Sequence, residues 1–261
     1  MGQGFHTALD ARNVATLTLA RGELHNAFDD ALIASLTAEI ARLGAIPDVR
    51  AIVLAAEGKS FSAGADLNWM KRMASYGEAE NRRDADALAE LMRALNECPK
   101  PTIARVQGPA FGGGVGLVAC CDMAVAAGTA TFCLSEVKLG LIPAVISPYV
   151  VRAMGARAAR RYFLTAEIFG AAEAHRLGLV HEVVPADALD GAVETLLGKL
   201  LAAGPAAVAE SKALIARVAE GDVDTAMIAD TAARIARIRV SPEGREGIAA
   251  FLAKRKPAWS A

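Results

Sequence analysis

The sequence predicts an α/β fold that ends in a helical region. Short runs typical of strands alternate with segments whose apolar residues recur at helical spacing. From about Tyr149 the helical period prevails, and beyond Gly204-Pro205 only helices are expected. We therefore expect an α/β core over residues 1–203 and a C-terminal helical region over residues 204–261.

Each expected element has a local signal. Residues 14–20 alternate apolar residues with threonine, as a half-buried strand does, and residues 51–55 form a short apolar run. Further strands are expected at residues 102–106 and 123–127. Helices are expected at residues 28–43, 83–95, 115–121, 149–154, 156–164, 171–177, 192–201, 206–219, 225–239 and 242–255.

Composition excludes several classes of protein. The 28 basic and 29 acidic residues give a net charge of −1, so no global field attracts nucleic acid or an anionic membrane. The longest uncharged run, residues 106–121, is shorter than the roughly 20 residues that cross a bilayer. The N-terminus shows no secretory signal pattern, so the cytoplasm is the expected location. The scattered histidines and cysteines lack metal-ligand spacing, and no metal site is expected.

Three segments that follow expected strands carry residues suited to chemistry. They are FSAGADLNWM at residues 61–70, GPAFGGGVGLVACCD at residues 108–122 and FCLSEVKLGLIP at residues 132–143. Three glycines that lead into a helix let a ligand approach backbone amides where the helix dipole favours negative charge, although they would equally suit a tight turn. The pattern lacks the GK[ST] of a phosphate loop and is not GxGxxG, so nucleotide hydrolysis and dinucleotide redox chemistry are disfavoured.

Together, the order and spacing of these segments closely resemble the crotonase (enoyl-CoA hydratase/isomerase) superfamily across nearly the whole chain. The resemblance implies a spiral of strand-strand-helix turns with a C-terminal helical oligomerisation region. It also implies that the amides of Ala65 and Gly113, the latter next to Gly112, form an oxyanion hole for a thioester oxygen. Two preorganised donors would stabilise enolate charge as it develops on that oxygen.

Glu136 is the candidate acid/base. It lies in the mostly apolar stretch FCLSEVKLG, where burial would raise the pKa of a carboxyl group toward a range useful for proton transfer. From the residues alone, a structural acid paired with Lys138 or an arginine is the stronger interpretation. The resemblance reverses that order, because Glu136 aligns with the catalytic glutamate that the family retains.

The sequence departs from its family at Gly116, where typical hydratases carry a second glutamate. Glu136 could orient a water alone and deliver the proton on the same face, with help from an acidic substrate's own carboxylate. It could instead shuttle a proton between two carbons, as an enoyl-CoA isomerase does. The segments FSAGADLNWMKRMA, AFGGGVGLVACCDMA and LSEVKLGLIPAVISPYVV resemble bacterial methylglutaconyl-CoA hydratases. This resemblance favours a hydratase and implies methylglutaconyl-CoA, an intermediate of leucine degradation, as its substrate.

The resemblance also implies contacts to coenzyme A, which enters as part of the substrate and not as a separate cofactor. Backbone around Ala63, Asp66 and Leu67 would meet the adenine end, and the segment around Asn26 and Ala27 the pantetheine. Gly112 is also expected to contact the substrate. Phe251 and Lys254 match positions that reach the coenzyme A of a neighbouring subunit, in a homotrimer or a dimer of trimers.

The sequence leaves two other functional classes open. One mammalian relative of this hydratase group binds AU-rich RNA through a lysine-rich helix, but residues 70–95 here mix basic and acidic side chains without a basic stripe. The missing glutamate also permits a catalytically silent CoA-binding protein, against which the intact Glu136 argues.

Overall fold

The computed structural model describes residues 4–219 and 221–260, and these divide into two compact units. Residues 4–98 and 102–193 belong to the first unit. Residues 99–101, 194–219 and 221–260 belong to the second. The division into residues 1–203 and 204–261 stays a prediction.

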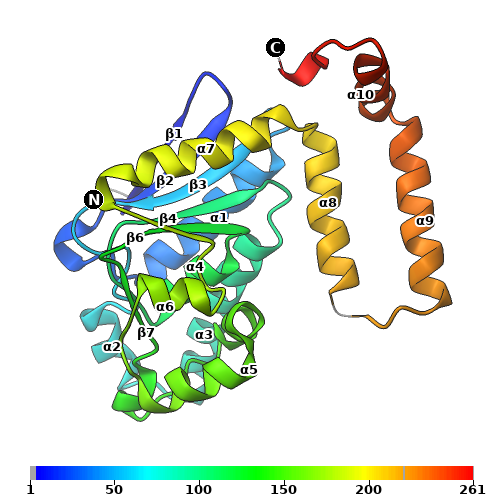
Figure 1. The fold of residues 1–261 in the computed structure, drawn as a ribbon. Coiled ribbons are helices and arrows are strands. Elements are labelled where there is room, and N and C mark those ends of the chain that lie inside the picture. The colour runs from blue at the N-terminus through cyan, green and yellow to red at the C-terminus, as the bar shows by residue number, and fades with distance from the viewer. Residues whose placement is uncertain (1–3, 220, 261) are drawn as a thin grey trace. The chain divides into compact units, whose positions relative to one another are not determined.

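A six-stranded sheet in the order β1-β2-β3-β4-β6-β9 forms the centre of the first unit. Its strands are β1 (Phe5–Leu9), β2 (Val14–Leu19), β3 (Ala51–Ala56), β4 (Thr102–Val106), β6 (Met123–Ala127) and β9 (Glu182–Val184). Only the β1-β2 pair is antiparallel. Figure 1 shows β2, β3, β4 and β6 side by side. Because parallel strands end at one edge, the loops after β3, β4 and β6 emerge together.

After these strands the chain continues into a smaller sheet. It contains β5 (Ala110–Phe111), β7 (Thr131–Cys133) and β8 (Phe169–Gly170), and a bridge between Ser62 and Ala110 joins the loop after β3 to it. The path runs β4, β5, α4 (Gly113–Cys120) and then β6, β7, η2 (Glu136–Leu139), α5 (Ser147–Thr165). These successive strand-strand-helix turns confirm the predicted spiral.

The first unit contains several other helices. They are η1 (Gly22–Leu24), α1 (Asp30–Ala45), α2 (Leu67–Met73), α3 (Glu78–Asn96), α6 (Ala171–Arg176) and η3 (Ala186–Ala188), and α7 (Leu189–Ala202) begins here. In α1, Leu32, Leu36, Ile40 and Leu43 are buried at the spacing of one helix face. The Asp29 side chain accepts a hydrogen bond from the Leu32 N–H and caps this helix.

The second unit confirms the predicted helical C-terminal region. It contains α8 (Pro205–Val218), α9 (Thr225–Val240), α10 (Pro242–Leu252) and η4 (Ala258–Ser260), and Figure 1 shows α8 and α9 running in opposite directions. The Glu243 carboxylate of α10 accepts hydrogen bonds from the Ala206 and Ala207 N–H groups at 2.9 and 2.8 Å. A negative side chain at the N-terminus of α8 satisfies amides that have no partner within that helix.

The differences from the sequence prediction concern short elements. The strands β1, β5, β7, β8 and β9 and the helix α2 were not predicted, because these segments contain neither an apolar run of four or more residues nor a long helical repeat. Helix α5 covers two predicted helices, since Gly155 breaks it with φ 77° and ψ 151°. In the described chain, no single helix is long and apolar enough to cross a membrane, although the bent pair of residues 186–202 and 205–218 passes by length and composition.

The Asn26 side chain stabilises the loop that precedes α1 through hydrogen bonds. It is fully buried, its amide nitrogen donates to the carbonyls of Glu57 and Ser60 at 2.8 Å, and its side-chain oxygen accepts from the Arg21 N–H at 2.9 Å. Asn26→Ala would leave these backbone groups unsatisfied, so we expect the free energy of unfolding in urea to fall by about 3 kcal/mol. Asn68→Ala, at an exposed position, is the control and should change it by less than about 0.5 kcal/mol. Equal effects of the two substitutions would contradict this role.

Candidate active site

The loop after β3 lies directly against the loop between β5 and α4. The Phe111 N–H donates to the Ser62 carbonyl at 2.8 Å, and the Phe61 and Ser62 N–H groups donate to the Pro109 carbonyl. Gly64 has φ +86°, and a Cβ added to it would lie 2.9 Å from the Phe111 carbonyl oxygen. Only glycine permits both this backbone conformation and this approach.

Two backbone amides at this junction have no hydrogen-bond acceptor among the described residues. The Phe28 N–H donates to the Gly64 carbonyl and the Asp66 N–H to the Phe28 carbonyl, which leaves the intervening Ala65 N–H out of the pairing. Gly113 is the first residue of α4, so its N–H has no partner within the helix. Among the described residues, neither amide donates a hydrogen bond. Both residues line one cavity of about 660 Å³ within the first unit.

Glu136 lines the same cavity. A Cβ on Gly112 would lie 3.2 Å from Glu136 Oε1, so the carboxyl group rests against the triple glycine. Its Oε2 atom is buried without a hydrogen-bond partner among the described residues. Burial raises the pKa of Glu136 above its ordinary value, and a hydrogen bond with its own backbone only partly opposes this. Within the described chain it forms no ion pair with Lys138, so the geometry favours the acid/base interpretation over the structural one.

Gly116 leaves no room for a second carboxylate. It lies inside α4, where a Cβ would contact Ile146 Cγ2 and would lie 2.9 Å from Ile146 Cβ and 3.1 Å from Met92 Sδ. Ile146 also lines the cavity. The volume that a glutamate side chain would need is therefore filled by apolar groups, and Glu136 faces the cavity without such a partner.

Only some of the predicted CoA-binding residues line this cavity. Ala63 and Gly112 line the cavity, whereas Asn26, Ala27, Asp66 and Leu67 are not among its lining residues. The Asp66 carboxylate caps α2 by accepting from the Asn68 and Trp69 N–H groups at 2.8 and 3.2 Å. Leu67 is 73% exposed.

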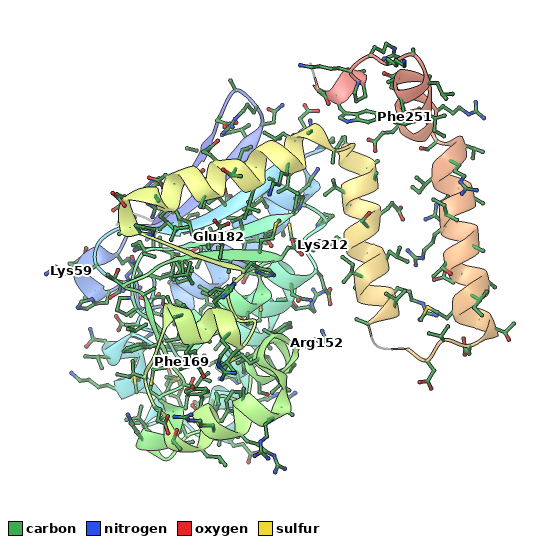
Figure 2. The ribbon with its side chains drawn as sticks, in the orientation of Figure 1. Lys59, Arg152, Phe169, Glu182, Lys212 and Phe251 are labelled. Carbon is green, nitrogen blue, oxygen red and sulfur yellow. The ribbon has the colours of Figure 1, made fainter. Side chains whose placement is uncertain are left out.

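Phe251 and Lys254 belong to the second unit. Phe251 is 82% exposed on α10, where Figure 2 labels it, and Lys254 follows that helix with φ 52°. Their proposed contact with coenzyme A requires a neighbouring subunit and stays a prediction.

The cavity contains residues that the sequence did not single out. Trp69 of α2 donates a hydrogen bond from Nε1 to Asp84 Oδ2 of α3 at 2.8 Å, and both line the cavity with Asn81 and Leu88. The sequence did not distinguish Asp84 as a site residue, because α3 carries many charged residues. Nowhere in the described ranges do three or more His, Cys, Asp or Glu side chains gather as metal ligands.

The arrangement can stabilise negative charge on an oxygen atom at two amides while one carboxyl group moves a proton nearby. Comparison with known proteins supports a site with this chemistry. The model of the enoyl-CoA hydratase/isomerase family matches residues 10–261. A crystal structure of an enoyl-CoA hydratase from Shewanella pealeana superposes with a TM-score of 0.95 at 48% identity, over 98% of this chain and 96% of that one.

Curated relatives show the same similarity. An enoyl-CoA hydratase of Alternaria alternata is 38% identical over 98% of this chain and 83% of its own length. A crotonyl-CoA hydratase of Syntrophomonas wolfei is 33% identical over 93% of both chains. The chain therefore belongs to the enoyl-CoA hydratase/isomerase family, the crotonase superfamily, and is an enzyme of that family.

The packing at Gly116 predicts an asymmetry between two helical glycines. Gly116→Ala should lower the free energy of unfolding by about 1–3 kcal/mol, because its methyl group would overlap Ile146. Gly198→Ala is the matched control, since Gly198 lies inside α7 with open space around its Cβ position. That change should raise the free energy of unfolding by about 0.4–1 kcal/mol. Urea unfolding of both variants measures these two changes. An increase in the unfolding free energy of Gly116→Ala would contradict the predicted overlap with Ile146.

The raised pKa of Glu136 predicts a pH-dependent cost to folding. Below its ordinary carboxyl pKa of 4.5 the group is protonated in both the folded and the unfolded chain. As the pH rises toward the raised folded-state pKa, the unfolded chain loses its proton first, so the wild type loses stability. Glu136→Gln lacks this loss, and its advantage in unfolding free energy should grow as the pH rises from 4.5 toward the raised folded-state pKa of Glu136. A difference that stays constant over this range would refute the prediction.

Proposed function

We propose that this enzyme adds water across the 2,3 double bond of an enoyl-CoA thioester. The proposal rests on the Glu136 carboxyl group, whose Oε2 atom is buried without a hydrogen-bond partner among the described residues, in the same cavity as the Ala65 and Gly113 amides. Relatives named enoyl-CoA hydratases support the reaction. Coenzyme A arrives as part of the substrate, and the proposal needs no further cofactor.

In the proposed reaction, the thioester oxygen accepts hydrogen bonds from the Ala65 and Gly113 amides. Water attacks C3 while Glu136 takes one of its protons, and the electron pair of the double bond moves toward the thioester oxygen. Glu136 then delivers that proton to C2, so that hydroxyl and hydrogen add across the bond. Each amide donor is worth about 2.7–4 kcal/mol in the transition state. A raised pKa suits Glu136 to both transfers.

Isomerisation is the second candidate, and the packed Gly116 favours it. Without a second carboxylate to hold water, Glu136 could take a proton from C2 of a 3-enoyl thioester and return it to C4. The same two amides would stabilise the intermediate enolate. No water enters or leaves in this reaction.

The identity of the acyl group is a separate proposal. Methylglutaconyl-CoA, an intermediate of leucine degradation, is a candidate because three segments of the sequence resemble hydratases that act on it. Crotonyl-CoA is a candidate because one relative bears the name crotonyl-CoA hydratase. The two differ in charge, since only the first acyl chain carries a carboxylate.

A trimer or a dimer of trimers is the proposed assembly. In the second unit, Val240, Ile248, Phe251 and Leu252 are each at least half exposed, and such apolar side chains suit a subunit interface. Phe251 and Lys254 would then reach the coenzyme A of a neighbouring subunit.

The contacts of α3 do not support RNA binding. Arg82 pairs with Asp86 at 2.8 Å, and Arg93 pairs with Glu90 at 2.6 Å and with Glu97 at 2.7 Å. Basic groups that are neutralised along the same helix leave no stripe of positive charge for phosphates.

The decisive assay offers methylglutaconyl-CoA, crotonyl-CoA and a 3-enoyl-CoA separately and identifies the products by mass. We expect a gain of one water with at least one conjugated thioester. Glu136→Gln should lower kcat by about 10²–10⁴-fold, since general acid-base catalysis contributes that much. Glu78→Gln, at an exposed position on α3, is the control and should leave kcat unchanged.

Three results would overturn parts of this proposal. Isomerisation of the 3-enoyl thioester at unchanged mass, with no hydration of the others, would replace hydratase by isomerase. Binding of all three thioesters without turnover would identify a catalytically silent CoA-binding protein. Near-normal activity of Glu136→Gln would remove Glu136 from the mechanism.

A further inference from the structure

The cavity has an unbalanced set of charges. Of the described residues that line it, Asp84 and Glu136 carry carboxyl groups, and none is a lysine, arginine or histidine. The other lining groups are mostly apolar, among them Trp69, Leu88, Leu139, Ile142 and Ile146. An acyl chain in this cavity would meet apolar walls and acidic groups.

Asp84 is held in place at this wall. Its Oδ2 atom accepts the 2.8 Å hydrogen bond from Trp69 Nε1, and the Trp69 ring is itself only 4% exposed. A side chain anchored to a buried indole cannot swing into solvent without leaving that N–H unpaired. The carboxylate is therefore a fixed feature of the cavity.

The cations nearest in sequence do not offset this charge. Lys71, Arg72, Arg83 and Lys138 flank lining residues along the chain, but none of them lines the cavity. Arg72 is engaged by Asp30 at 2.6 Å. A carboxylate at the far end of an acyl chain would thus find no positive partner on the described wall.

We propose that Asp84 makes this enzyme select acyl chains that carry no distal carboxylate. The inference rests on the proposed function, because it takes a CoA thioester as the ligand. A neutral acyl chain buries its carbon atoms against the apolar walls. A dicarboxylic chain must bring a further negative charge into a cavity that Asp84 lines and that offers no positive side chain among its described lining residues. Crotonyl-type thioesters are therefore favoured over methylglutaconyl-CoA.

Binding of two unreactive thioesters tests this selection apart from catalysis. Butyryl-CoA and glutaryl-CoA are saturated and differ at the end of the acyl chain, where only the second carries a carboxylate. Titration calorimetry on the full-length protein should give a Kd for glutaryl-CoA at least about tenfold weaker than that for butyryl-CoA. Equal or tighter binding of glutaryl-CoA would overturn the proposal.

Substitution of Asp84 identifies the group responsible. Asp84→Asn removes the charge and keeps an oxygen that can accept from Trp69, so the ratio of the two Kd values should fall to about threefold or less. Asp84→Ala, a second variant that lacks the charge, should shift the ratio in the same direction. Asp86→Asn is the matched control, because Asp86 lies on the same helix, pairs with Arg82 and does not line the cavity. An unchanged ratio in both Asp84 variants would refute the role of Asp84.

Turnover separates this inference from the proposed function. If the protein prefers butyryl-CoA but neither hydrates nor isomerises any enoyl thioester, the proposed function fails while the selection stands. If it hydrates crotonyl-CoA and methylglutaconyl-CoA with equal kcat/KM, the selection fails while the function stands. If neither saturated thioester binds, both fail.

Discussion

The close approach of two loops is the constraint on which the rest of the site depends. The carbonyl of Phe111 lies so near the Cα of Gly64 that any side chain there would collide with it. This contact places the Ala65 amide in the same cavity as the first amide of α4. Each loop satisfies the other's neighbouring backbone groups, and the Ala65 and Gly113 amides are left to serve a ligand. The donors are preorganised because the fold needs the same backbone contacts.

The same packing that creates the site limits its chemistry. Ile146 fills the space beside Gly116, so the helix that supplies one amide cannot also supply a carboxylate. Proton transfer then falls to Glu136, whose carboxyl group is buried and lacks a hydrogen-bond partner among the described groups at one oxygen. Burial without a counter-charge raises its pKa, which destabilises the folded protein at neutral pH and suits the group to exchange protons.

The charge on the cavity wall bears on which substrates the site accepts. The amides need an electron-rich oxygen, which a thioester provides, and the apolar walls need a hydrocarbon chain. Asp84, held by Trp69, places a carboxyl group on the wall of the same cavity.

The sequence by itself determined the long helices, such as α1 and α9, and through the spacing of three segments it indicated the family and the candidate site residues Ala65, Gly113 and Glu136. Hydrophobic periodicity and glycine patterns are local, so they are readable along the chain. Only the tertiary structure showed that Ile146 fills the space beside Gly116 and that the Asn26 side chain hydrogen-bonds to backbone groups. It also showed that Asp84 lines the cavity. Those facts depend on side chains from distant segments that meet in space, and one-dimensional spacing does not record such contacts.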